Sequence, residues 1–189
     1  MMYWMGQFCG LLATVGCVIV PFFRKKWQML ADVVATNLLM ALNYLLIGQF
    51  GSATLLCGLA AVQGVRSLVH NQRDQQAGRG EIALFTVLYV ALGFYGLMMR
   101  PGYVPGLNAG NLLELLPICW ALLNMVFILV KDPQTSRRVL LLINFTWAIY
   151  SAIVGAAAVF AELVTMATTL YTMYRYRGEG DAAPELAAD

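Results

Sequence analysis

The feature that most constrains this chain is a succession of apolar stretches, each long enough to cross a lipid bilayer. One membrane-spanning helix needs about 20 mainly apolar residues. Turns are excluded from the hydrocarbon because the backbone there must satisfy its own hydrogen bonds. Charged or Gly/Pro-rich segments interrupt the apolar stretches, and this pattern predicts seven helices. Their expected ranges are Gly6–Phe23, Trp27–Ile47, Ser52–His70, Ile82–Met99, Leu112–Val130, Arg137–Val154 and Ala158–Tyr176.

The composition supports a membrane location and excludes several classes of function. Hydrophobic residues make up 60% of the 189 residues and charged residues 12%, whereas a soluble domain has about 25% charged residues. Seven spans would use about 140 residues, which leaves no room for an appended catalytic domain. A net charge of +2 does not indicate a nucleic-acid partner, which requires a concentrated basic face. The cysteines stand singly in apolar runs and predict neither disulfides nor a metal site: Cys9, Cys17, Cys57 and Cys119.

The distribution of basic residues predicts how the chain is oriented. If all seven helices cross the membrane, eleven of the twelve Lys and Arg residues lie on one side, and Arg100 lies on the other. The positive-inside rule assigns the basic side to the cytoplasm, so we expect the N-terminus outside and the C-terminus inside. No basic segment precedes the first helix, which is therefore not expected to be a signal peptide. The acidic segment 178–189 lacks aromatic residues and is predicted to be disordered.

The two halves of the chain correspond at a fixed offset. Sliding the chain by 107 residues lays the first three predicted helices on the last three without a gap, and Asn37 then falls on Asn144. A single helix between two three-helix units gives both units the same orientation, so we predict an all-α membrane protein with two parallel repeats, as in SWEET transporters. The expected parts are a first repeat (1–71), a loop with a linker helix (72–111), a second repeat (112–177) and a tail (178–189).

Four short segments of the second half carry a likeness to a known family. They are Glu114-Leu115-Leu116-Pro117-Ile118, Asn144-Phe145-Thr146-Trp147, Ala161-Glu162-Leu163 and Tyr174-Arg175-Tyr176-Arg177. In their order and spacing, the chain resembles the bacterial inner-membrane YgjV family over most of its length up to the tail. We class that family with the MtN3-like superfamily, which includes SWEET sugar transporters, PQ-loop proteins and PnuC vitamin transporters. The resemblance implies a multi-pass protein of the bacterial inner membrane with a transporter-like fold.

The candidate site consists of polar residues deep inside the apolar stretches, where they are costly and usually face a cavity. Asn37 lies about 15 Å along its helix from Trp27, near the bilayer midplane, and Asn144 holds the same place in the second half. Their amides could bind a neutral solute rich in hydroxyl or amide groups, with Trp147 stacking on it. The alternatives are interhelical packing of the two amides and core packing of Trp147. Further candidates for substrate binding are Tyr44, Asn43, Gln63 and Asn124.

Three charged residues inside the spans suggest more specialised roles. Glu162 lies near the outer mouth and could couple a proton to transport, although it could also only stabilise a neighbouring helix. Asp32 and Arg66 lie at equal depth on helices joined by a tight turn. We therefore predict a salt bridge between them, which acts either as an inner gate or as a static structural pair.

Together these patterns predict a carrier that takes a small neutral polar metabolite from one side of the membrane to the other by alternating access. The metabolite would be similar to a sugar, a nucleoside or a vitamin. The alternative is a non-transporting membrane receptor or scaffold of the same fold, with a dry interior. No HExxH or GxSxG motif and no paired carboxylates on one face occur. We therefore expect no enzyme, no cofactor and no metal. The expected partners are the lipid bilayer and a small-molecule substrate, and no nucleic acid.

Overall fold

A computed structural model describes residues 2–48, 51–99, 103–106, 108–113, 115–153 and 158–177. Within these ranges the chain is all-helical, and the predicted helices are confirmed. The long helices are α1 (Met2–Ile19), α2 (Lys26–Leu46), α3 (Ser52–Gln72), α4 (Arg79–Met98), α6 (Leu115–Leu129), α7 (Pro133–Ile153) and α8 (Ala158–Arg175). Two short elements, η1 (Val20–Phe22) and α5 (Ala109–Leu113), accompany them. The expected tail 178–189 and the turn at 155–157 lie outside the described residues.

Local signals in the sequence account for several helix ends. Pro21 lacks the N–H that an α-helix requires, and the chain there tightens into the 3₁₀ turn η1 before it extends at Phe23. Gly48 adopts a positive φ of 77° just after α2, a conformation that favours glycine. At the start of α7, the Asp132 carboxylate accepts a hydrogen bond of 2.6 Å from the backbone N–H of Thr135, as expected of a residue that caps a helix.

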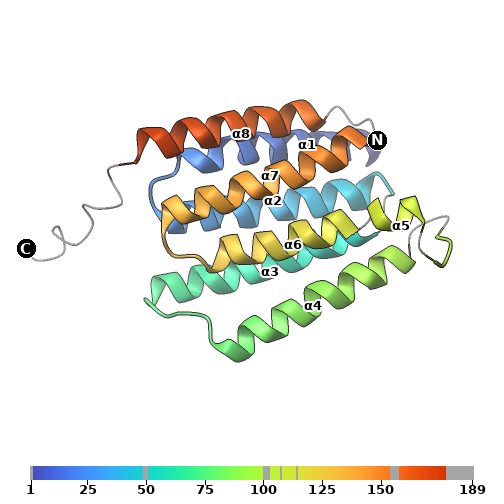
Figure 1. The fold of residues 1–189 in the computed structure, drawn as a ribbon, viewed down its shortest axis with the longest axis horizontal. Helices are drawn as coiled ribbons and strands as arrows, with labels where there is room; N and C mark the ends of the chain where they lie inside the picture. The colour runs from blue at the N-terminus through green and yellow to red at the C-terminus, as the bar shows by residue number, and fades with distance from the viewer. Residues whose placement is uncertain are drawn as a thin grey trace, which may run out of the picture.

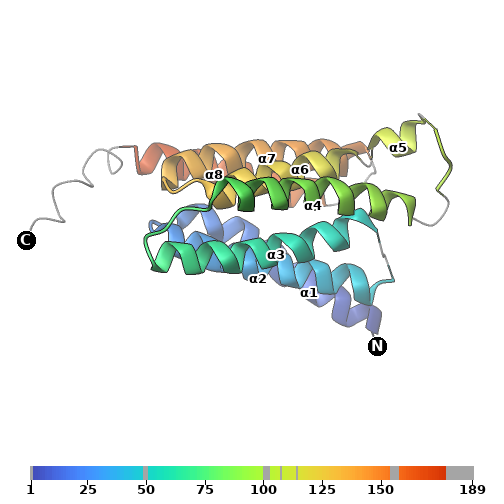
Figure 2. The ribbon, with the colours of Figure 1, turned by 90° about the horizontal axis from the view of Figure 1, so that it is seen from below.

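The helices form two layers. Figure 2 shows α1, α2 and α3 in one layer and α6, α7 and α8 in the other, with α4 beside α3 and α6. In Figure 1 the helix axes run roughly along one direction, so the turns gather at two ends of the molecule. We call the end that holds residues 23–25, 73–78 and 130–132 the basic end, and the other one the opposite end. Most of the Lys and Arg residues lie at or near the basic end.

The two layers are built alike and are held together at their edges. In the first layer α2 packs between α1 and α3, and in the second α7 packs between α6 and α8. Between the layers, α3 packs on α6 and α1 on α8. The two middle helices, α2 and α7, therefore face each other across the interior. Their bounds differ by the same number of residues at both ends, since 133 − 26 = 107 and 153 − 46 = 107.

The surface of the bundle is apolar, as expected of a protein in contact with lipid. Large hydrophobic side chains such as Trp4, Val87 and Phe145 are more than half exposed, which a soluble protein would avoid over so wide an area. Five helical segments of the described chain are long and apolar enough to cross a membrane: Met2–Phe22, Lys26–Leu46, Ser52–Gln72, Arg79–Met98 and Gly110–Leu129. The remaining long helices, α7 and α8, pack against each other, and they also pack against α6 and α1, respectively.

Close packing of α3 on α4 generates a prediction. A Cβ atom added at Gly96 would lie 2.4 Å from the backbone N and Cα atoms of Ser52, whereas a Cβ at Gly58 would meet nothing within 4 Å. We expect Gly96→Ala to destabilise the protein by about 1–3 kcal/mol, because backbone cannot move aside as a side chain can. Gly58→Ala, the matched control, should be neutral or stabilise by up to about 1 kcal/mol.

Thermal unfolding of the two purified variants in detergent measures this difference. A melting temperature for Gly96→Ala equal to that of Gly58→Ala would contradict the packing of α3 against α4.

Candidate functional site

A cavity of about 80 Å³ lies between the two layers, where the middle of α2 faces the middle of α7. Its polar lining comes from carboxamides, hydroxyls, two indoles and the carboxyl groups of Asp32 and Glu162. No Lys, Arg or His side chain lines it among the described residues. The volume suffices for a few water molecules, each of which occupies about 30 Å³ in the liquid. It is smaller than the pocket of a typical small-molecule ligand, which has about 300 Å³ or more.

Asn37 and Asn144 both line this cavity, as predicted, and they are held in the same way. Each is buried, and the Nδ2 atom of each donates a hydrogen bond of 2.8 Å to a carbonyl one turn earlier in its own helix, that of Val33 or Leu140. The two donors thus bond within their own helices and not across to a neighbouring helix. This backbone bond fixes both amides in one orientation on facing helices.

Asn124 of α6 is the least satisfied polar residue of the cavity. Its side chain is 5% exposed, and its Nδ2 atom has no hydrogen-bond partner. Buried amide nitrogens nearly always have a partner, which can be an ordered water or a ligand. Asn124 was predicted from its depth, and its unpaired donor marks it as a group that can bind a molecule in the cavity.

Two tryptophans form one wall of the cavity. The ring centroids of Trp120 and Trp147 lie 5.5 Å apart, and the ring planes are inclined by 37°. Trp147 was predicted, but Trp120 was missed. The signal that could have revealed Trp120 is its depth: it lies in the middle of an apolar span, away from the interfacial belt that tryptophan usually occupies.

A wider cavity of about 330 Å³ adjoins the central one on the side of the opposite end. It is lined by Gln7, Gly10 and Asn43, near the start of α1 and the end of α2. The two cavities share five lining residues: Cys17, Met40, Tyr44, Trp147 and Glu162. Predicted residues Tyr44 and Glu162 therefore lie where the outer cavity meets the central one, whereas Asn43 belongs to the outer cavity alone.

Towards the basic end the central cavity is closed by an apolar cluster. On every helix that contributes, these residues lie on the basic-end side of the cavity amides. They are Val20, Met29, Leu30, Val33, Phe127, Ile128, Leu140 and Ile143. Both layers supply side chains to this cluster.

Two buried cations join the two layers close to this cluster, near the basic end. Lys26, in the first turn of α2, donates hydrogen bonds of 2.6 Å to the Phe127 carbonyl and 2.8 Å to the Ser136 hydroxyl. Arg137 of α7 reaches the other way and donates bonds of 3.0 Å and 2.8 Å to the carbonyls of Pro21 and Phe23. Carbonyls near a helix C-terminus lack partners within the helix and attract cations, so each layer holds the end of a helix of the other.

The predicted salt bridge between Asp32 and Arg66 is not formed. Asp32 lines the central cavity, whereas the Arg66 Nε atom lies 3.2 Å from Glu81 Oε1 at the start of α4. Arg66 lies on the face of α3 that packs against α4 and not on the face that packs against α2. Its partner therefore comes from α4. His70, one turn further along α3, joins the same carboxylate, with its Nε2 atom 2.9 Å from Glu81 Oε2. These two residues therefore do not form a gate with each other.

Gln63, the remaining predicted residue, lies away from the cavity. Its Oε1 atom accepts a hydrogen bond of 2.7 Å from the Tyr89 hydroxyl of α4, and it lines neither of the two adjoining cavities. The depth of Gln63 in its span predicted a contact with the substrate. Its side chain instead points towards α4 and lies between α3 and α4. Among the described residues, no group of three or more metal-ligating side chains could hold a metal ion.

Several residues that line the central cavity are separated by the same number of positions. Five pairs of its residues are separated by 107 positions: Cys17 and Asn124, Val33 and Leu140, Thr36 and Ile143, Asn37 and Asn144, and Met40 and Trp147. Each layer therefore presents corresponding positions to the same space. The aromatic and carboxylate groups break this correspondence, because Ala13 and Val139 stand where the other half has Trp120 and Asp32.

The family model Imp-YgjV, described as a bacterial inner membrane protein, matches residues 4–179. No curated protein and no solved structure matches the chain.

The unpaired amide of Asn124 generates a prediction. We expect Asn124→Leu to leave the free energy of unfolding in detergent unchanged or to raise it by up to about 1 kcal/mol. The melting temperature measures this effect. The change removes a buried donor without a partner and nearly keeps the volume. Gln63→Leu is the matched control: it should destabilise by about 1–3 kcal/mol, because it leaves the buried Tyr89 hydroxyl without its acceptor. Equal destabilisation by both variants would make Asn124 an ordinary packing residue.

Proposed function

We propose a transport function for this chain, which belongs to the Imp-YgjV family of bacterial inner membrane proteins. In this proposal the protein carries a small neutral polar metabolite through the central cavity by alternating access. The observation that carries the proposal is the set of three buried amides, Asn37, Asn124 and Asn144, on one cavity between the layers. Polar residues inside membrane helices are costly. They usually face the bundle interior or a water-filled cavity, and they mark substrate paths.

Most polar groups of the described lining are uncharged and favour a substrate with hydroxyl or amide groups, whereas Asp32 and Glu162 add two carboxyl groups. Three amides offer both donors and acceptors, and the two indoles offer flat apolar faces for a sugar ring or a heteroaromatic ring. The lack of a basic group among the described lining residues disfavours an anion. Sugars, nucleosides and vitamins with neutral polar groups fit this description.

Two parallel repeats would explain how one site can open to either side. The equal bounds of α2 and α7, the five lining pairs 107 residues apart and the matching order of the layers all support such repeats. Such repeats would be related by an axis that runs along the membrane normal through the cavity, as in SWEET transporters. The same proposal takes all seven long helices as spans, with the basic end in the cytoplasm.

Alternating access requires a state that is closed at one end, and the contacts of Lys26 and Arg137 are well placed to hold it. The outer cavity leads from the opposite end to the central one, while the apolar cluster and the two cations close the basic end. Opening at the basic end would require these hydrogen bonds to break and the layers to rock apart. Glu162 lies at the junction of the two cavities, where its carboxyl group could carry a proton with the substrate.

The rival function is a non-transporting receptor or scaffold with the same fold. It is favoured by the small volume of the central cavity, about 80 Å³. It also requires the amides to serve as contacts between helices. The amide donors of Asn37 and Asn144 bond within their own helices, which favours the carrier.

Uptake into proteoliposomes tests the carrier directly. We expect the purified protein to catalyse uptake of at least one radiolabelled compound from a panel of sugars, nucleosides and neutral vitamins. Asn144→Ala should reduce this uptake by about tenfold or more, because a lost hydrogen bond of about 1.4 kcal/mol changes an equilibrium tenfold.

Thr146→Ala on the same helix is the matched control. Its hydroxyl also bonds a carbonyl one turn earlier, at 2.9 Å from Leu142, but it does not line either of the two adjoining cavities. Uptake should be unchanged in this variant. Equal uptake by Asn144→Ala and Thr146→Ala would exclude the assigned site, and no uptake of any compound by the wild type would favour the receptor.

A further inference from the structure

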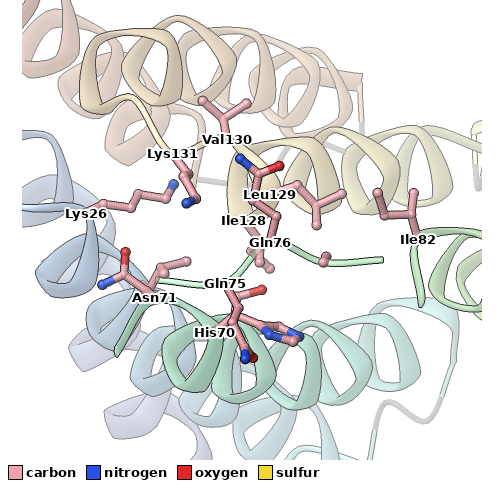
Figure 3. A pocket seen from close by; sticks show the side chains of 13 residues that line it. Lys26, His70, Asn71, Gln75, Gln76, Ile82, Ile128, Leu129, Val130 and Lys131 are labelled. Carbon is pink, nitrogen blue, oxygen red and sulfur yellow. The ribbon is translucent and has the colours of Figure 1, made fainter. Parts of the chain in front are cut away.

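A third cavity, of about 300 Å³, lies at the basic end and plays no part in the proposed transport path (Figure 3). Its walls come from the start of α2, the end of α3, the loop 75–77, the start of α4 and the end of α6. It is therefore bounded by α2 and α3 of the first layer and by α6 of the second. The apolar cluster, which includes Leu30 and Ile128, separates it from the central cavity.

The polar lining of this cavity is cationic and rich in donors. Lys26 and Lys131 both line it, and the carboxamides of Asn71, Gln75 and Gln76 complete its polar part. Figure 3 shows these side chains around the opening between the α3 helix and the end of α6. No Asp or Glu lines the cavity among the described residues, so the charged groups of its described lining are all basic.

Each of the two acidic residues nearby is either exposed to solvent or already paired with other side chains. Asp74 lies 3.2 Å from the Lys131 ammonium, but it is 99% exposed, and such surface pairs contribute little. Glu81 is bound by Arg66 and His70. The Nδ1 atom of His70, which lines the cavity, is buried without a hydrogen-bond partner. Because Nε2 of His70 faces a carboxylate and carries the proton of a neutral ring, Nδ1 is left as an acceptor for a protonated phosphate oxygen. The carboxamide N–H groups can donate to the other phosphate oxygens.

We propose that this basic-end cavity binds a phosphate group, carried either by a soluble phosphate compound or by the head group of an anionic phospholipid. A phosphate has several acceptor oxygens and at least one negative charge. Lys131 and the neighbouring amides can donate to it, and so can the one N–H group of the Lys26 ammonium that does not bond Phe127 or Ser136. Ile82 and Leu129 add an apolar wall, against which an acyl chain or the carbon skeleton of a phosphate ester can pack. The occupant contacts both layers and thereby stabilises the closed basic end.

Binding is tested on the full chain without any transport assay, so this proposal and the carrier proposal can fail separately. In detergent, melting temperatures are measured with inorganic phosphate and with chloride at the same ionic strength. In a second arm, native mass spectrometry counts phosphatidylglycerol and phosphatidylcholine molecules retained by the protein. Stabilisation by phosphate identifies a soluble ligand, and preferential retention of phosphatidylglycerol without stabilisation by phosphate identifies the lipid.

Lys131→Gln and Lys131→Glu should weaken whichever binding is found by about tenfold or more, with the larger loss in the charge reversal. Lys131 is 48% exposed, so neither change should disturb folding. Lys25→Gln and Lys25→Glu are the matched controls, because Lys25 is exposed at the same end but does not line the cavity. The proposal is overturned if phosphate and phosphatidylglycerol both fail to bind, or if the Lys25 and Lys131 variants lose binding equally.

Discussion

In a bundle of this length every buried polar group must find its partner within the protein or in an enclosed cavity, because hydrocarbon offers none. The described residues meet this constraint in three ways. Asn37 and Asn144 bond the backbone of their own helices, and Gln63 bonds Tyr89 of a neighbouring helix. Asn124 is left with an unpaired donor at the central cavity. The Nε2 atom of Gln63 is also buried without a partner, but it lies away from this cavity. The functional hypothesis therefore rests on the position of Asn124 at a cavity that water or a ligand can enter, and not on its missing partner alone.

The interior differs sharply between the two ends of the molecule. On one side of the buried amides the cavities widen towards the opposite end, and on the other an apolar cluster and two buried cations join the layers. Lys26 and Arg137 each cross from a middle helix to carbonyls at the end of a helix in the other layer. These bonds link the layers, and neither Lys26 nor Arg137 lines the central cavity.

The number, type and order of the helices could be predicted because apolar length and interrupting charges fix them locally. Depth along a helix also placed Asn37, Asn124 and Asn144 correctly at one cavity. The partner of Arg66 could not be predicted, because it depends on which neighbour that face of α3 meets. Lys26 was counted as one of several basic residues that orient the chain, and only the packing of α2 against α6 and α7 turns its ammonium inward.

Accessibility of the central cavity from each side of the membrane tests the account most directly. Thr36 lines this cavity and is close in shape to cysteine. Thr36→Cys is made in a chain whose native cysteines are replaced by serine, and a membrane-impermeant thiol reagent is applied to right-side-out and to inside-out vesicles. A carrier that alternates predicts labelling of this cysteine in both preparations. Labelling from one side alone, or from neither side, would contradict alternating access through this cavity.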